Sequence, residues 1–396
     1  MIHLPSSSTV NYCGFAVNAG TRDEQPEEYG LAHFVEHMLF KGTVKRKSWH
    51  ILNRMENVGG ELNAYTTKED TFVYASCLSD DVERAIELLC DLVCNSRFPD
   101  KEIAKEKEVV LDEINSYKDN PSELIFDDFE DLLFEGHGIG HHILGEKKSL
   151  KKFNRNKCLS FFKRHYRPDN MVFFFYGQTG FSRVLRLLMR FWNERNGENE
   201  GNERNERVVP SVIETRQVEI DKKLHQAHVM IGSRAYDLHS EKRTGLYLLN
   251  NILGGHGMNS RLNLSLREKY GLVYTVESGI TAYSDSGLFS IYFGTDPKSK
   301  EKCIGIAMRE INRLCNEKLK PLQLTAAKKQ LKGQLGIASD NGENRALGMG
   351  KNFLHLNQYD NLQRIYEKID NVTSEELMET ANEILNEKNL FRLVYV

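Results

Sequence analysis

The feature that most constrains the fold is a polar segment in the middle of the chain. Residues 194–207 read ERNGENEGNERNER and include no apolar side chain, so they cannot join a hydrophobic core. The segment divides the 396 residues into two parts of about 200 residues, each long enough to form a domain. We therefore predict a domain over residues 1–193, a polar linker over 194–209, and a second domain over 210–396.

The order of the expected elements is the same on both sides of this segment. Each half shows a strand, a helix, two strands that form a hairpin, further helices and a final strand. Such a repeat predicts an α+β fold of two duplicated domains, each with a mainly antiparallel sheet covered by helices. The expected strands cover residues 10–18, 61–66, 71–79, 171–176, 212–221, 226–232, 273–282, 287–293 and 390–396, and the main helices cover 27–40, 48–58, 80–94, 100–117, 122–134, 148–165, 181–193 and 241–253.

The composition argues against several classes of partner. The 53 Lys and Arg residues nearly balance 56 Asp and Glu residues, for a net charge of −3, so we expect no nucleic acid partner. No apolar run reaches the roughly 18 residues that cross a bilayer, so we expect no membrane partner. The first residues lack the features of a signal peptide, which predicts a cytoplasmic location for the chain as written. Residues 2–9 resemble the end of a strand and a turn, so we expect a trimmed N-terminal edge.

The seven cysteines are an odd number and are scattered through apolar patterns. A Cys in such a pattern acts as a small apolar side chain. Cys90 and Cys94, four residues apart on a Leu-rich helix, fit this description. The sequence therefore predicts buried thiols in a reducing compartment.

Two histidines in the first half are spaced for a metal ion. His33 and His37 lie four residues apart on the expected helix, so both imidazoles can reach one ion, and Glu36 lies beside them. This H-x-x-E-H order is the inverse of the zinc-peptidase motif H-E-x-x-H. The pattern arises by chance in roughly 0.03 of such chains, so two surface histidines beside a salt-bridging Glu remain the alternative. When the halves are aligned, the three positions fall on Leu248, Asn251 and Ile252.

A catalytic zinc site needs a third protein ligand and an open position. The expected helix 100–117 offers Glu106 and Glu113, which are seven residues apart and share one face. We expect Glu113 to be the ligand and Glu106 to orient a histidine. The residue pattern alone does not choose between these two and Glu108.

Three segments, GLAHFVEHMLFKGT at 30–43, GGELNAYT at 59–66 and EKEVVLDEI at 106–114, resemble the pitrilysin family of inverted zinc peptidases, which includes insulysin and the mitochondrial processing peptidase. The segment GGHGMNSRLNLSLREKYGLVY at 254–274 is similar to a further motif of that family. The resemblance implies one Zn²⁺ per chain. The residue roles that it implies are His33, His37 and Glu113 as ligands, Glu36 as general base, Tyr274 and Arg267 as groups acting on the oxyanion and the substrate, and Asn63, Ala64 and Tyr65 as an edge strand that pairs with a peptide.

We therefore expect a zinc metalloendopeptidase that hydrolyses peptides or unfolded protein segments. The alternative is a catalytically silent family member that acts as a scaffold or partner subunit, although silent relatives lose the zinc motif. Insulysin-like relatives carry four such domains, with the zinc motif in the first and the Arg/Tyr motif in the last. This chain holds both motifs in two domains, which predicts a homodimer in which the zinc domain of one copy faces the Arg267/Tyr274 domain of the other. A heterodimer with a related chain would use the same surfaces.

Overall fold

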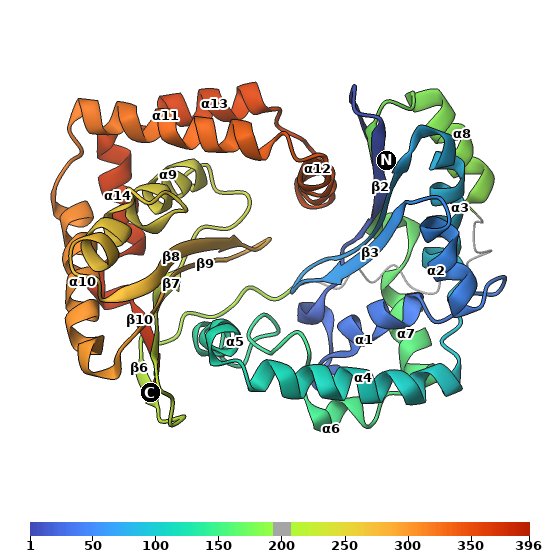
Figure 1. Ribbon diagram of the computed structural model, residues 1–396, viewed down its shortest axis with the longest axis horizontal. Helices are drawn as coiled ribbons and strands as arrows, with labels where there is room; N and C mark the ends of the chain where they lie inside the picture. Colours follow the sequence, from blue (N-terminus) through green and yellow to red (C-terminus); the bar gives the residue numbers. More distant parts are fainter. Residues whose placement is uncertain (193–206) are drawn as a thin grey trace. The chain divides into compact units, whose positions relative to one another are not determined.

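The computed structural model describes residues 1–192 and 207–396, so the predicted linker 194–209 lies mostly outside the described residues (Figure 1). The chain forms two compact units. The first unit combines Met1–Ser116, His141–Val208 and Ser339–Tyr359, and the second combines Tyr117–Gly140, Val209–Ala338 and Asp360–Val396. These units differ from the expected ranges 1–193 and 210–396, because each unit includes one helical segment from the other half of the sequence.

The first unit is built on a five-stranded sheet in the order β1-β5-β2-β4-β3. Strand β1 runs parallel to β5, and every other neighbouring pair is antiparallel. Strand β3 forms one edge. The strands are β1 (Ile2–Pro5), β2 (Val10–Val17), β3 (Glu61–Thr66), β4 (Thr71–Leu78) and β5 (Met171–Gly177).

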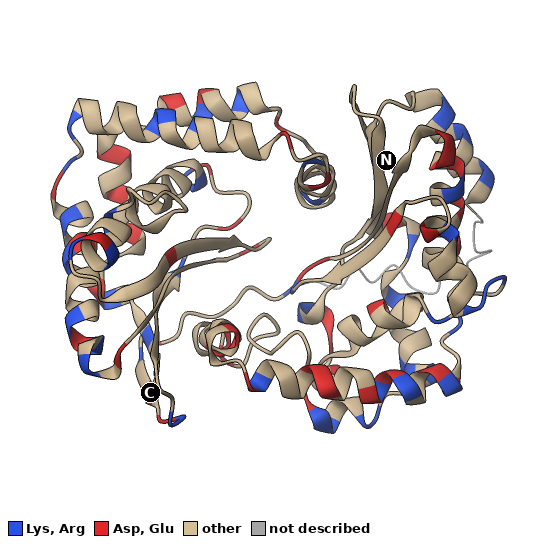
Figure 2. Cartoon of the chain, viewed as in Figure 1, with Lys and Arg blue, Asp and Glu red and all other residues tan. Residues whose placement is uncertain are grey.

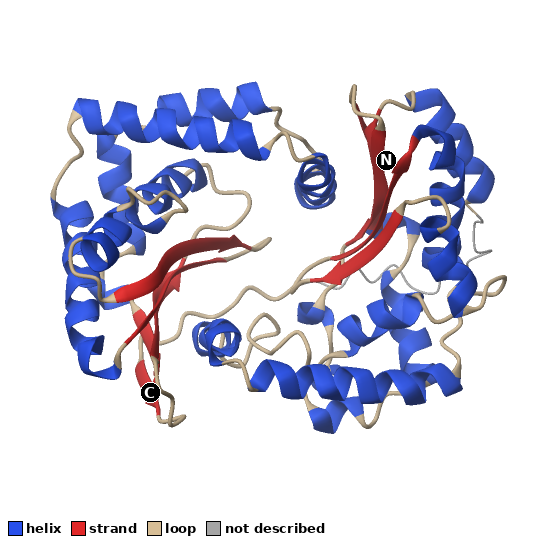
Figure 3. Cartoon of the chain, in the orientation of Figure 1, coloured by secondary structure: helices blue, strands red, loops and turns tan. Residues whose placement is uncertain are grey.

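Helices cover both faces of this sheet (Figure 3). Strand β4 shows why: Val73 and Ala75 point into the main core, whereas Phe72 and Tyr74 point to the opposite face and pack against helix α12 (Gly342–Leu356). A strand buried on both faces needs apolar residues at successive positions rather than at alternate ones. The other helices are α1 (Leu31–Leu39), α2 (Ser48–Glu56), α3 (Val82–Asn95), α4 (Asp100–Lys118), α6 (Lys147–Leu150), α7 (Arg155–His165) and α8 (Phe181–Phe191).

The second unit repeats this topology. Its sheet has the order β6-β10-β7-β9-β8, with β6 parallel to β10 and the remaining pairs antiparallel. Helix α5 (Pro121–Leu133) covers one face, in the way that α12 covers the first sheet. The strands are β6 (Gln217–Ile220), β7 (Ala227–Arg234), β8 (Val273–Ala282), β9 (Gly287–Thr295) and β10 (Phe391–Tyr395), and the helices of the main core are α9 (Arg243–Gly254), α10 (Lys300–Asn316), α11 (Pro321–Ala338), α13 (Leu362–Asn371) and α14 (Ser374–Ile384). The predicted α+β fold with two duplicated, mainly antiparallel sheets is confirmed.

Most predicted elements differ from the structure by one or two residues at their ends, and three are wrong because they are split or much shorter than predicted. The expected helix 27–40 is interrupted near Gly30. A short 3₁₀ turn covers Pro26–Glu28, Gly30 adopts a left-handed conformation with a φ of +93°, and α1 begins at Leu31. The expected helix 148–165 is two helices, because Asn154 caps α7 by accepting the N–H of Lys157. The expected strand 212–221 is ordered as a strand only over Gln217–Ile220.

The expected burial of the thiols agrees with the structure. All seven cysteines lie within the described residues, and they are buried without forming a disulfide. Acidic and basic residues are both present along helices such as α4 and α10, whereas α5 carries only acidic charges and α8 only basic ones (Figure 2). Within the described ranges, every helix is too short or too polar to cross a lipid bilayer.

Candidate metal centre

Helix α1 carries the H-x-x-E-H residues on a rigid and deeply buried support. Leu31, Phe34, Val35 and Met38 pack into the main core of the first unit. The start of the helix is fixed from outside, because Glu24 accepts the backbone N–H of Gly30 at 2.8 Å and that of Ala32 at 2.6 Å. These two amides would otherwise lack a partner at the helix N-terminus. The cap therefore sets the position of the first helical turn, which contains His33.

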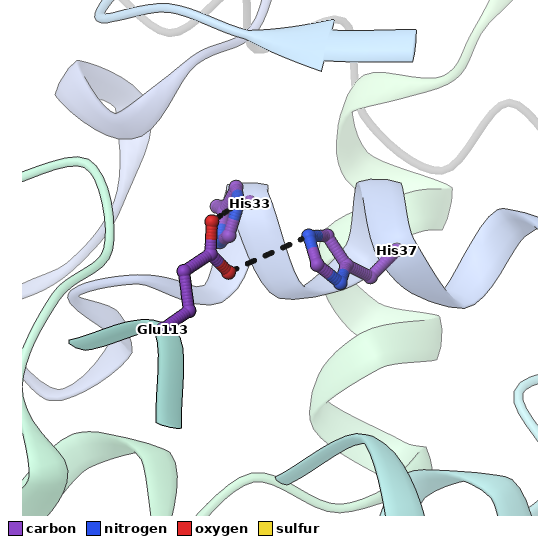
Figure 4. Close-up of side chains that lie close together, drawn as sticks. All are labelled: His33, His37 and Glu113. Atoms are coloured by element: carbon purple, nitrogen blue, oxygen red, sulfur yellow. Dashed lines mark ion pairs between the residues drawn. The ribbon is translucent and has the colours of Figure 1, made fainter. Parts of the chain in front are cut away.

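The two histidines of α1 meet Glu113 of α4 (Figure 4). The distance from His33 Nε2 to Glu113 Oε1 is 3.8 Å, and that from His37 Nε2 to Glu113 Oε2 is also 3.8 Å. One ligand atom from each of the three residues lies within 4.8 Å of the others, and no other group of three or more such residues is found in the described part of the chain. The structure thus brings together the three residues predicted as ligands.

This arrangement fits a zinc ion. Tetrahedral zinc with bonds of about 2.0–2.2 Å places its ligand atoms about 3.3–3.6 Å apart, so a small contraction of the group suffices. Burial lowers the pKa of His33 to about 3, which keeps its imidazole neutral, as a metal ligand must be. Glu113 Oε2 is buried and makes no hydrogen bond to any described residue. A cation at this point would satisfy that oxygen.

Glu106 holds the second histidine, as expected. Its Oε1 lies 2.9 Å from His37 Nδ1, and its Oε2 lies 2.6 Å from Lys41 Nζ. Burial acts to raise the pKa of Glu106, but the hydrogen bonds from His37 and Lys41 outweigh it and lower the pKa. The ionised carboxylate only accepts, so Nδ1 carries the proton and Nε2 is left for a metal. Glu108, the third carboxylate left open by the sequence, is exposed.

Glu36 is buried beside the ligands but outside the metal-binding group. Its Oε2 accepts the hydroxyl hydrogen of Thr66, the last residue of β3, at 3.1 Å. Burial raises the pKa of Glu36, although the nearby His37 and the Thr66 hydrogen bond oppose this rise. A carboxylate with a raised pKa is suited to accept a proton near neutral pH.

Three supporting residues were missed by the sequence analysis. Glu24 lies six residues before Gly30 and reaches the helix from outside it, so no helical spacing marks it. Thr66 ends the quoted segment GGELNAYT, and its hydroxyl at the end of a strand was an available signal. His141 also supports the site, because its Nε2 lies 2.9 Å from Glu24 Oε2.

The predicted peptide-binding residues lie on a sheet edge. Asn63, Ala64 and Tyr65 are in β3, whose only strand partner among the described residues is β4. The other side of β3 therefore presents backbone groups to which an extended peptide can bind.

Arg267 and Tyr274 lie together in the second unit. The guanidinium carbon of Arg267 is 5.8 Å from the centre of the Tyr274 ring, and the Tyr274 side chain is 84% exposed. Tyr274 is therefore not part of the hydrophobic core. Arg267 is part of a π-helical turn, Asn263–Glu268, a form often found at functional sites.

Comparison with known proteins identifies the family. Residues 2–147 match the family model described as insulinase (peptidase family M16), and residues 152–331 match the model of the peptidase M16 inactive domain. A protein of Rickettsia felis described as an uncharacterized zinc protease is 33% identical over 93% of this chain and 88% of its own length. A Bacillus subtilis protein with the same description is 31% identical over 96% of this chain and 92% of its own length.

Solved structures share the fold. A protein from Pseudomonas fluorescens described as a peptidase M16 inactive domain has a TM-score of 0.91 and 20% identity, covering 99% of this chain and 94% of that one. A protease from Helicobacter pylori has a TM-score of 0.90 and 18% identity, with 99% and 95% coverage. A chain of complex III from Candida albicans has a TM-score of 0.85 and 16% identity, with 99% and 92% coverage. By sequence and by fold, the chain belongs to peptidase family M16, the insulinase family.

Proposed function

We propose that the protein is a zinc metalloendopeptidase that hydrolyses peptides or unfolded protein segments. The observation that carries this proposal is the meeting of His33, His37 and Glu113 around one point, with the buried carboxylate of Glu36 beside them. A purely structural zinc site has four protein ligands, whereas a catalytic site has three and an open position. Relatives named as zinc proteases support the same conclusion.

The three ligands would hold one zinc ion. When bound, the ion would act as a Lewis acid on the scissile carbonyl and would lower the pKa of a water molecule. Glu36 then accepts the proton of the attacking water at Oε1, because Oε2 is occupied by the Thr66 hydroxyl. It passes this proton to the leaving amine. Glu106 keeps Nδ1 of His37 protonated and fixes the orientation of the ring.

Substrate binding would use the β3 edge. An extended peptide that pairs with Asn63, Ala64 and Tyr65 is held through its backbone, so the site tolerates many side-chain sequences. The roles proposed for Tyr274 and Arg267 are a hydrogen bond to the developing oxyanion and a contact to the substrate backbone or an anionic group. The high exposure of Tyr274 supports this assignment, since its ring is available to a ligand.

The functional form would be a homodimer, in which Arg267 and Tyr274 of one copy act on a peptide held at the zinc ligands of the other copy. A heterodimer with a related chain would use the same residues. The chain from complex III shows that this fold occurs within a larger assembly.

The test compares zinc content and cleavage of a quenched peptide library for the wild type and Glu36→Gln. We expect Glu36→Gln to keep one zinc per chain and to lose turnover by about 10² to 10⁴. His37→Ala should lose the metal as well. Cleavage by Glu36→Gln at the wild-type rate would refute the assignment of the base, and a zinc-free, inactive wild type would favour a silent partner subunit.

A further inference from the structure

The turn between β3 and β4, residues 67–70, contains three charged residues that are buried. Lys68, Glu69 and Asp70 are 3%, 3% and 0% exposed, although a hairpin turn usually lies in solvent. Buried charges need partners, and each of these residues has its own. Lys68 Nζ donates to the backbone oxygen of His141 at 2.6 Å, and Glu69 Oε1 accepts from Arg22 Nη1 at 2.5 Å.

Asp70 is held by a helix that is distant in the sequence. Its Oδ2 accepts Nε2–H of His355 at 2.9 Å and lies 3.4 Å from Lys351 Nζ. Both partners belong to α12, which packs across the outer face of the first sheet through Met349. The Asp70 and His355 side chains are both almost completely buried, at 0% and 3% exposure. Water therefore offers little replacement for this contact.

The same turn leads directly to the catalytic residues. Asp70 Oδ1 accepts the hydroxyl of Thr67 at 2.7 Å, and Thr67 Oγ1 in turn accepts the backbone N–H of Asp70 at 3.1 Å. Thr67 follows Thr66, whose hydroxyl donates to Glu36. A continuous path of hydrogen bonds and one peptide link thus joins His355 to Glu36.

We propose that Asp70 and His355 are a positioning pair that fixes Thr66 against Glu36. The inference rests on the proposed peptidase function. Neither residue touches the substrate, and the pair acts through the conformation of residues 66–70. The buried acceptor of Asp70 is matched by a donor from α12, so this hydrogen bond, rather than the apolar packing of the helix, fixes residues 66–70.

The first test measures steady-state cleavage and zinc content of His355→Ala. Because displacement of a catalytic group by a fraction of an ångström lowers the rate strongly, we expect kcat to fall about tenfold, with KM changed less than about twofold and zinc content unchanged. His355→Gln should restore most of the rate, since its side-chain amide can donate to Asp70. Met349→Ala is the matched control, because it loosens the packing of α12 without touching Asp70. An equal loss of kcat in Met349→Ala and His355→Ala would overturn the proposal.

The second test is a double-mutant cycle with Thr66→Val, which removes the hydroxyl that binds Glu36. If the pair acts through Thr66, the double variant Thr66→Val/His355→Ala has the same kcat as Thr66→Val alone. If the two substitutions instead lower kcat by factors that multiply in the double variant, His355 has an independent, structural role and the proposal is overturned.

A third measurement does not depend on activity. Hydrogen exchange of the amides of residues 66–71 is measured by mass spectrometry, with and without zinc. His355→Ala should speed this exchange at least about tenfold, His355→Gln should restore it, and Met349→Ala should leave it close to wild type. If the wild type binds zinc but cleaves no peptide, the proposed function fails, and the exchange data still decide the positioning role. Unchanged exchange in His355→Ala would overturn it.

Discussion

Replacing Glu106 by Gln tests how much the carboxylate behind His37 contributes to zinc binding. Glu106 accepts from His37 Nδ1 at 2.9 Å and from Lys41 Nζ at 2.6 Å. A glutamine has one acceptor and one donor group, so its NH₂ must face either the His37 N–H or the Lys41 ammonium, and one contact is lost. The negative charge that makes the His37 ring more basic is lost too. Outer partners of this kind change metal affinity by about 10–100-fold, which corresponds to about 1.4–2.7 kcal/mol.

The assay is competition for zinc against a chromophoric chelator at neutral pH, where the lowered pKa keeps Glu106 ionised. Glu108→Gln is the matched control, because it removes the same charge from an exposed position of the same helix. We expect zinc affinity to fall only in Glu106→Gln, and thermal unfolding of the metal-free proteins shows that both variants fold. A zinc affinity of Glu106→Gln within about twofold of the control would refute this reasoning.

Three further predictions follow from the same geometry. Glu24→Ala leaves two buried amides at the start of α1 without an acceptor, so chemical denaturation should show a loss of about 2–6 kcal/mol, and a loss below about 0.5 kcal/mol would contradict the cap. The pKa of Asp70 is lowered to about 2, because the hydrogen bond from His355 and the charge of Lys351 outweigh the effect of burial. The ionised carboxylate therefore stabilises the fold by about 2 kcal/mol above pH 4, and this contribution is lost as the pH falls from about 4 to 2. Urea titrations of Asp70→Asn across this pH range should lack that acid-dependent loss of stability. Glu36→Gln and Tyr274→Phe, each nearly inactive alone, should regain activity after subunit exchange, and a mixture that stays inactive despite proven exchange would rule out the shared site.

The local part of the metal centre could be predicted because helix geometry alone decides it. Residues at i and i+4 on a helix share a face, so His33 and His37 had to lie together once the helix was recognised. The hairpin strands were similarly marked by turn residues and by apolar runs, and both appear at 61–66 and near 71–79 as expected. The choice of Glu113 over Glu106 and Glu108 required the family resemblance, since all three share a polar helix.

The rest depends on contacts between residues far apart in the sequence. No local pattern shows that α12 belongs to the first unit or that α5 belongs to the second, because an amphipathic helix does not specify which sheet it covers. The break before α1 depends on the left-handed conformation of Gly30, which permits the close approach of Leu144 O. Glycine occurs both inside helices, with a negative φ, and at helix ends, with a positive φ. The sequence therefore did not show whether Gly30 lies inside the helix or at its end.

The two halves of the chain provide an internal comparison that bears on why the metal residues are present. Helices α1 and α9 each follow the second strand of their sheet, and in α9 the aligned Leu248 and Ile252 pack against an apolar core. In α1 the same positions carry His33 and His37, next to the buried Glu36 and opposite the unsatisfied oxygen of Glu113. Buried polar groups cost free energy unless they are paired. The second unit shows that this fold is completed without them, and the cation proposed to bind both histidines and Glu113 would satisfy the Glu113 oxygen that accepts no hydrogen bond from a described residue.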